Sequence, residues 1–143
     1  MRFILSLFFT FLFSYSAVAQ DIIPQPADLI KKEGTFIITK NTSLVISNDA
    51  DIKAAEFLNS YLKKIYGVEL PVKKQVVKNS IQINTKLKGD KDVYVLESNA
   101  DGISITGATY AGTFYGMQTL IQLLPVQRSS SLKIPAVTIE DEP

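Results

Sequence analysis

The sequence predicts an α+β fold, in which a mostly antiparallel sheet carries two helices on one face in a two-layer sandwich. Several short runs alternate apolar and polar residues, as half-buried strands do. Two longer segments, 51–66 and 109–124, instead repeat apolar residues every three or four positions, which is the helical period. Turn-sized gaps between neighbouring strand runs favour antiparallel pairing.

Residues 1–19 are predicted to be a cleavable secretory signal. Arg2 supplies a positive charge, residues 3–13 are mostly apolar, and an A-x-A cleavage site ends at Ala19. The apolar stretch is shorter than the roughly 20 residues that span a bilayer, which disfavours a permanent membrane anchor. Cleavage removes Arg2 from the 15 basic residues and leaves 20–143 as one domain with 14 charges of each sign. We therefore expect a secreted or periplasmic protein that is free of the membrane once the signal is cleaved.

The first part of the mature chain is predicted to be extended. Residues 22–26 hold two prolines, which suit an edge strand or an arm and exclude a central strand. Residues 36–39 and 43–46 are β-branched runs, separated by the turn-sized segment 40–42 with Asn41 at its centre. These two runs are expected to form a hairpin or two successive edge strands.

An amphipathic helix is predicted to begin near Asp51. Asn48 or Asp49 can cap its free amide groups, and Gly67 suits a left-handed stop. The apolar residues of its buried stripe are Ile52, Ala55, Leu58, Leu62 and Ile65.

Three further strands are predicted at 81–85, 93–97 and 103–106, where apolar and polar residues alternate. Segment 98–102 contains Asn, Asp and Gly, so the last two runs are expected to form an antiparallel hairpin. The charged segment 86–92 is typical of a solvated loop.

A second helix is predicted from Thr109 to Leu124, where Pro125 ends it. Gly112 and Gly116 lie on one side of it, and each costs the helix about 1 kcal/mol relative to Ala. Close packing against the sheet or a second domain is the expected compensation, and this helix should be more buried than the first. Its apolar stripe is Phe114, Met117, Ile121 and Leu124, widened by Tyr110, Ala111, Leu120 and Leu123.

The remaining residues complete the sheet. Segment 127–131 is a polar loop and 134–139 a final extended piece, followed by the acidic segment 140–143.

Composition excludes many classes of protein. The chain has no His and no Cys, which excludes disulfides, thiolate nucleophiles, Ser-His-Asp arrangements and ordinary zinc, haem or iron–sulfur ligation. The formal charge of +1 provides no basic field to attract nucleic acid or anionic lipid.

Four segments resemble functional motifs, but each is better explained without a functional role. Asp141 and Glu142 are adjacent in an extended tail and point to opposite faces, which indicates a solvated linker rather than a catalytic pair. Segment 49–51 lacks the rest of a calcium loop and is explained by helix capping. Segment 129–131 has no base to activate its serines, and 107–112 lacks the spacing of a phosphate loop. We therefore predict no catalytic, cofactor-binding or metal-binding residue in this chain.

Tyrosine side chains can stack on sugar rings, but most of those present are expected to pack in the core because they lie on or beside the apolar stripes of helices and strands. They are Tyr61, Tyr66, Tyr94, Tyr110 and Tyr115.

Several segments together resemble the N-terminal non-catalytic domain of glycoside hydrolase family 20 β-N-acetylhexosaminidases. The most specific is the F-Y-G-x-Q-T-L-x-Q-L-L run within 112–124, and 93–96 and 102–108 are also similar. Segment 22–26 is similar to the family's opening, and 134–143 to the strand and junction that lead into its catalytic barrel. The resemblance covers essentially all of residues 20–143.

This resemblance implies an exported exo-glycosidase that removes terminal β-linked N-acetylglucosamine or N-acetylgalactosamine and needs no cofactor. In the family the substrate's acetamido oxygen attacks the anomeric carbon, an Asp orients the acetamido group, and the neighbouring Glu is the general acid/base. These residues belong to a (β/α)8 barrel of about 250 residues, which the mature chain is too short to contain. The expected partner of this domain is therefore the barrel of the same full-length chain, and no catalytic residue is carried over.

Two alternatives remain at this stage. One is the N-terminal domain of another glycosidase family, acting on O-linked N-acetylglucosamine or on glucuronides. The other is a free-standing carbohydrate-binding or scaffold module.

Overall fold

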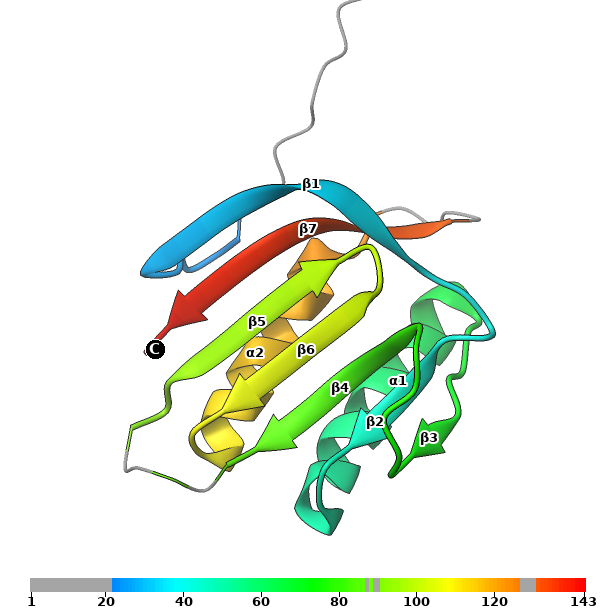
Figure 1. Cartoon of the computed structure of the whole chain (residues 1–143), viewed down its shortest axis with the longest axis horizontal. Coiled ribbons are helices and arrows are strands. Elements are labelled where there is room, and N and C mark those ends of the chain that lie inside the picture. The colour runs from blue at the N-terminus through cyan, green and yellow to red at the C-terminus, as the bar shows by residue number, and fades with distance from the viewer. Residues whose placement is uncertain (1–21, 87, 89–90, 127–130) are drawn as a thin grey trace, which may run out of the picture.

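A computed structural model describes residues 22–86, 88, 91–126 and 131–143. It has a seven-stranded sheet with both helices on one face, which confirms the predicted α+β class (Figure 1). The predicted signal, 1–19, lies outside the described residues, within which no helix is long and apolar enough to cross a membrane. In chain order the elements are β1 (Asp28–Ile38), β2 (Ser43–Ile46), a 3₁₀ turn (Asp49–Asp51), α1 (Ile52–Tyr66), β3 (Val72–Lys73), β4 (Ser80–Thr85), β5 (Tyr94–Asn99), β6 (Gly102–Gly107), α2 (Tyr110–Leu123) and β7 (Leu132–Asp141).

The sheet is mixed rather than mostly antiparallel. Its strand order is β1-β7-β5-β6-β4-β2-β3. The pairs β1–β7, β7–β5 and β5–β6 are antiparallel, whereas β6–β4, β4–β2 and β2–β3 are parallel. Helix α1 lies between β2 and β4 in the sequence. It carries the chain back to the end of the sheet at which β2 begins, so that β4 runs parallel to β2.

The hairpin predicted between 36–39 and 43–46 is wrong. The first run belongs to β1, an edge strand that pairs with β7, while the second is β2, which lies between β3 and β4. All four residues of β2 are buried, which suits a strand with a neighbour on each side. Segment 22–26 forms no strand and is an arm, with Ile22 buried.

Helix α1 has the predicted boundaries. The Asn48 side chain accepts hydrogen bonds from the amides of Ala50 and Asp51, at 2.9 and 3.2 Å. At the other end Gly67 has a left-handed φ of 72° and its amide bonds the last turn. The middle of the predicted stripe is buried (Ala55, Leu58 and Leu62), whereas Ile52 is exposed.

Helix α2 is more buried than α1, as expected, and Met117 and Leu124 of the predicted stripe are in the core. Phe114 and Ile121 are only half-buried, and the face toward the sheet contains both glycines. A side chain at Gly116 would meet Ile105 and Tyr94 of the sheet, so the glycines permit the close approach that their spacing predicted. The buried residues of α2 are Gly112, Thr113, Gly116, Met117, Thr119, Leu120 and Leu123.

The β5–β6 hairpin is confirmed, and the Asn99 side chain accepts bonds from the amides of Asp101 and Gly102 in its turn. The final strand is longer than predicted and lies between β1 and β5.

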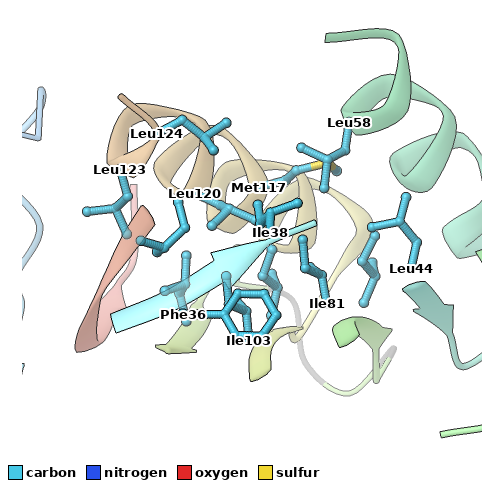
Figure 2. Packing of buried hydrophobic residues seen from close by; sticks show 14 of the residues in the cluster. Phe36, Ile38, Leu44, Leu58, Ile81, Ile103, Met117, Leu120, Leu123 and Leu124 are labelled. Atoms are coloured by element: carbon cyan, nitrogen blue, oxygen red, sulfur yellow. The ribbon is translucent and has the colours of Figure 1, made fainter. Parts of the chain in front are cut away.

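The core fills the space between the sheet and the two helices. Figure 2 shows Leu58 of α1 and Met117 and Leu120 of α2 close to side chains of the sheet. The largest fully buried side chains include Phe36, Leu44, Leu58, Leu62, Leu70, Ile81, Ile83, Leu96, Ile103, Ile105, Met117 and Leu120. The candidate site lies at one end of this layer, where the first turns of α1 and α2 meet the end of β4.

Candidate functional site

A hollow of about 660 Å³ opens where the first turns of α1 and α2 meet the end of β4. The two helices cover the same face of the sheet, and Figure 1 shows them behind the strands. The walls of the hollow are mainly apolar, and its polar lining comes from few side chains. The lining residues are Ala50, Asp51, Lys53, Ala54, Phe57, Thr85, Tyr110, Ala111, Thr113 and Phe114.

Two aromatic side chains that line this hollow, Phe57 and Tyr110, are exposed. Phe57 of α1 and Phe114 of α2 contact each other with ring centroids 5.0 Å apart, yet Phe57 is 41% exposed. Tyr110 and Tyr115 of α2 are 50% and 36% exposed. Clustered aromatic surface of this kind is typical of an interaction site.

The polar floor of the hollow is a buried hydrogen-bonded chain. The Thr85 hydroxyl donates to Asp51 Oδ1 at 2.6 Å, and the hydroxyl oxygens of Thr85 and Thr113 are 2.7 Å apart. All three side chains belong to buried residues, and Asp51 is only 1% exposed. These hydrogen bonds join the 3₁₀ turn before α1, the end of β4 and the first turn of α2.

The paired carboxylates at 141–142 are used for structure. Asp141 Oδ1 accepts a hydrogen bond from the amide of Ala27 at 3.0 Å. Glu142 forms an ion pair with Lys91 at 2.8 Å, and this hydrogen-bonded pairing raises the pKa of Lys91. The two carboxylates therefore have separate partners, and Asp141 ends β7 and does not belong to the expected solvated linker.

The remaining motif candidates fit local packing. Asp49 forms an exposed ion pair with Lys74 at 2.7 Å, beside the cap made by Asn48. A side chain at Gly107 would meet the backbone of Thr113, so the turn before α2 is close-packed. Residues 129 and 130 lie outside the described part of the chain, within which no cluster of three or more His, Cys, Asp or Glu could hold a metal ion.

The tyrosines divide into two groups. Tyr94 is buried, its hydroxyl lies 2.7 Å from that of Thr119, and burial raises its pKa. Tyr66 is half-buried, donates to the carbonyl of Pro125 and has a pKa raised by burial. Tyr61 packs edge-on against Tyr66 with centroids 6.3 Å apart. Core packing thus holds for three of the five, whereas Tyr110, which lines the hollow, and Tyr115 are exposed.

Two features of the hollow are absent from the sequence predictions. The contact between Asp51 and Thr85 joins residues 34 positions apart, and no local pattern indicates it. Phe57 lies off the buried stripe of α1, and a large aromatic residue on the polar side of an amphipathic helix is the signal that could have identified it.

Comparisons with known proteins identify relatives of this domain. The family model "Glycosyl hydrolase family 20, domain 2" matches residues 19–142. A beta-hexosaminidase of Porphyromonas gingivalis is 33% identical over 133 residues, covering 86% of this chain and 17% of the relative. A beta-hexosaminidase of Vibrio vulnificus is 31% identical over 131 residues, covering 89% of this chain and 14% of the relative.

Solved structures agree with this assignment. The GH20 beta-N-acetylhexosaminidase from Streptomyces coelicolor A3(2) has a TM-score of 0.76 and 29% identity, covering 87% of this chain and 27% of that chain. The chain thus spans less than a fifth of the curated relatives cited above and about a quarter of this structure.

Proposed function

Because the chain belongs to the glycosyl hydrolase family 20, domain 2 family, we propose that it is the N-terminal, non-catalytic domain of an exported β-N-acetylhexosaminidase. The observation that carries the proposal is the match of 19–142 to this domain, while the beta-hexosaminidases it resembles are several times longer. The family match favours family 20 over another glycosidase family.

The role proposed for this domain is to pack against a (β/α)8 catalytic barrel through the helix face. The apolar hollow and the exposed rings of Phe57 and Tyr110 in its lining support this role, because they leave apolar surface that the sheet does not cover. Interfaces between domains of one chain commonly bury surface of this kind.

The chemistry is proposed to reside in the barrel. The substrate's acetamido oxygen would attack the anomeric carbon, and an Asp and a Glu of the barrel would orient that group and act as acid and base. In this chain Asp141 and Glu142 already have structural partners, which supports a non-catalytic role. Terminal β-linked N-acetylglucosamine or N-acetylgalactosamine is the proposed substrate class.

Residues 1–19 are proposed to direct export and to be cleaved after Ala19. The charged start, apolar stretch and A-x-A site support this assignment. Mass spectrometry of the exported protein should find Gln20 at the N-terminus, and retention of Met1 would contradict the proposal.

Activity measurements test the proposed function. The product of the complete reading frame should release the leaving group of a β-N-acetylglucosaminide, and residues 20–143 alone should release none. A β-glucoside with the same leaving group serves as the control, since it lacks the acetamido group. Hydrolysis by residues 20–143 at enzymatic speed would contradict the proposal, as would a complete product that leaves the acetamido substrate intact.

A free-standing carbohydrate-binding module is the second candidate, because the exposed Tyr110 and Tyr115 offer aromatic faces for sugar rings. Calorimetry with chitooligosaccharides distinguishes it. Heat that disappears in Tyr110→Ala would favour this candidate, and no heat would favour the barrel-packing role.

A further inference from the structure

The carboxylate of Asp51 lies at the floor of the hollow and accepts a hydrogen bond from the Thr85 hydroxyl, at 2.6 Å from Oδ1. The Thr113 hydroxyl lies 2.7 Å from that of Thr85 and donates to the carbonyl of Thr109 at 3.1 Å. Asp51 lies at the start of α1, where the helix dipole favours negative charge.

One oxygen of this carboxylate is left without a donor. Asp51 Oδ2 is buried and accepts no hydrogen bond from the described residues. None of the ion pairs within those residues includes Asp51, and the neighbouring Asp49 pairs with Lys74. Lys53 is the cationic residue of the lining, and its side chain is exposed. A buried acceptor without a partner is costly, so a donor from outside the domain would gain much by reaching it.

The walls of the hollow define the chemistry of that donor. Ala54 and Phe57 on one helix and Ala111 and Phe114 on the other offer apolar contacts, while Asp51 offers a single negative charge at the floor. An aliphatic stem with a cationic end matches both parts, because Lys and Arg pack their methylene groups on apolar surface and hydrogen-bond carboxylates with their charged ends.

We propose that this hollow receives a basic side chain, Arg or Lys, from the domain that packs on the helix face, and that this side chain binds the Asp51 carboxylate. The identity of that domain rests on the proposed function, in which the same polypeptide continues into a (β/α)8 barrel. The occupant is assigned by charge complementarity, because an ionic contact on the floor requires a cation. The contact would help to fix how the two domains are oriented, since it holds the basic residue against one carboxylate at the floor of the hollow.

The site can be tested on this chain with a small probe. Nα-acetyl-arginine amide is titrated against residues 20–143 while the backbone amide resonances of Ala54, Thr85 and Thr113 are followed by NMR. The neutral isostere Nα-acetyl-citrulline amide should bind at least tenfold more weakly. Equal binding of the two probes, or no saturable shift with either, overturns the proposal.

Two asparagine variants distinguish an effect of the Asp51 carboxylate from an effect of net charge. Asp51→Asn should abolish the preference for the arginine probe, whereas the matched variant Asp49→Asn should keep it, because Asp49 lies on the exposed side of the same turn. Both variants remove one negative charge, so a loss in both would show only a change in net charge and would overturn the assignment to Asp51.

Hydrogen exchange on the complete polypeptide tests the source of the basic side chain. Asp51→Asn should speed exchange at least tenfold in one segment outside residues 20–143, and Asp49→Asn should leave that segment unchanged. Faster exchange confined to residues 20–143 would show a structural role for Asp51 and overturn the docking assignment. These outcomes do not depend on glycosidase activity, so they fail separately from the proposed function.

Discussion

At the scale of single residues, the glycines of α2 set how closely the helix lies on the sheet. A Cβ at Gly112 would lie 2.6 Å from the carbonyl oxygen of Val93 and 2.9 Å from that of Asp92, both fixed backbone atoms. A Cβ at Gly116 would instead meet side-chain atoms of Ile105 and Tyr94 at 2.8 and 2.9 Å, which are buried but less firmly fixed than backbone atoms. The two sites therefore differ in how much the surroundings can yield.

Replacing these glycines should destabilise the domain unequally. Gly112→Ala is expected to cost about 3 kcal/mol and Gly116→Ala about 1 kcal/mol, because overpacking outweighs the gain of about 1 kcal/mol in helix propensity. Urea unfolding followed by circular dichroism measures both. Gln118→Ala, at an exposed position of the same helix, is the control and should change little. A stabilised Gly112→Ala would show that the close contact is absent.

Tyr94 should make stability depend on alkaline pH. Burial raises the pKa of Tyr94 above its ordinary value of 10.0, with a smaller contribution from the charge of Asp141 and an opposing one from the hydrogen bond to Thr119. Since the folded state holds the neutral phenol more tightly, its stabilisation is complete below pH 10.0 and is lost as pH rises through the raised pKa. The free energy of unfolding should therefore fall above this pH.

The variant Tyr94→Phe isolates this effect. Loss of the hydroxyl should cost about 1 kcal/mol at neutral pH, and the fall of stability at alkaline pH should become shallower. Urea unfolding on both sides of the ordinary tyrosine pKa gives both quantities. Tyr110→Phe, at a half-exposed position, should change neither. Parallel alkaline curves for the wild type and Tyr94→Phe would contradict the assignment.

At the scale of elements, the helices could be predicted closely because their signals are local. The cap at Asn48, the stop at Gly67 and the cap at Thr109 all lie within a few residues of the turns they end. The pairing of β1 with β7 could not be predicted in this way, because the two strands are separated by most of the chain. The turn-sized gap at 40–42 predicts a hairpin. The four buried residues of β2 instead fit its position inside the sheet.

The cap of α2 also joins this helix to the segment before β5. Thr109 Oγ1 accepts a bond from the amide of Gly112 at 3.0 Å, and its hydroxyl donates to Asp92 Oδ1. Thr109→Ala is expected to cost about 1 to 2 kcal/mol because it leaves the amide without its partner. Thermal unfolding measures the loss. Thr109→Ser keeps the hydroxyl and should restore most of it, and a serine variant as unstable as the alanine variant would indicate methyl packing in place of capping.

At the scale of the whole molecule, the two helices are covered by the sheet on one side and are partly exposed on the other. The sheet side of α1 and α2 is filled by the core, whereas the first turns of both helices leave an apolar hollow with exposed rings. The apolar excess of α2 could be recognised from the sequence, because apolar residues extend beyond one face. The hollow itself could not, because it forms only when Thr85 of β4 is brought beside Asp51 and Thr113.

The exposed helix face should therefore govern both self-association and domain packing. Phe57→Gln is expected to reduce self-association of residues 20–143, because it removes exposed aromatic surface from the face on which the proposed second domain would pack. In a complete polypeptide with the proposed second domain, the same change should lower stability by about 1 kcal/mol, since that domain would no longer bury the exposed part of the ring. Analytical ultracentrifugation measures the first effect and thermal unfolding the second.

Val76→Gln provides the matched control, because Val76 is 71% exposed and lies in the loop before β4, away from the lining of the hollow. If apolar exposure alone caused self-association, both substitutions would reduce it equally and neither would affect the complete polypeptide. Phe57→Gln can act selectively on both residues 20–143 and the complete polypeptide only if one surface serves both contacts. The surface through which the isolated domain associates is then the surface that the proposed second domain covers. Equal effects of the two substitutions would mean that packing uses another face.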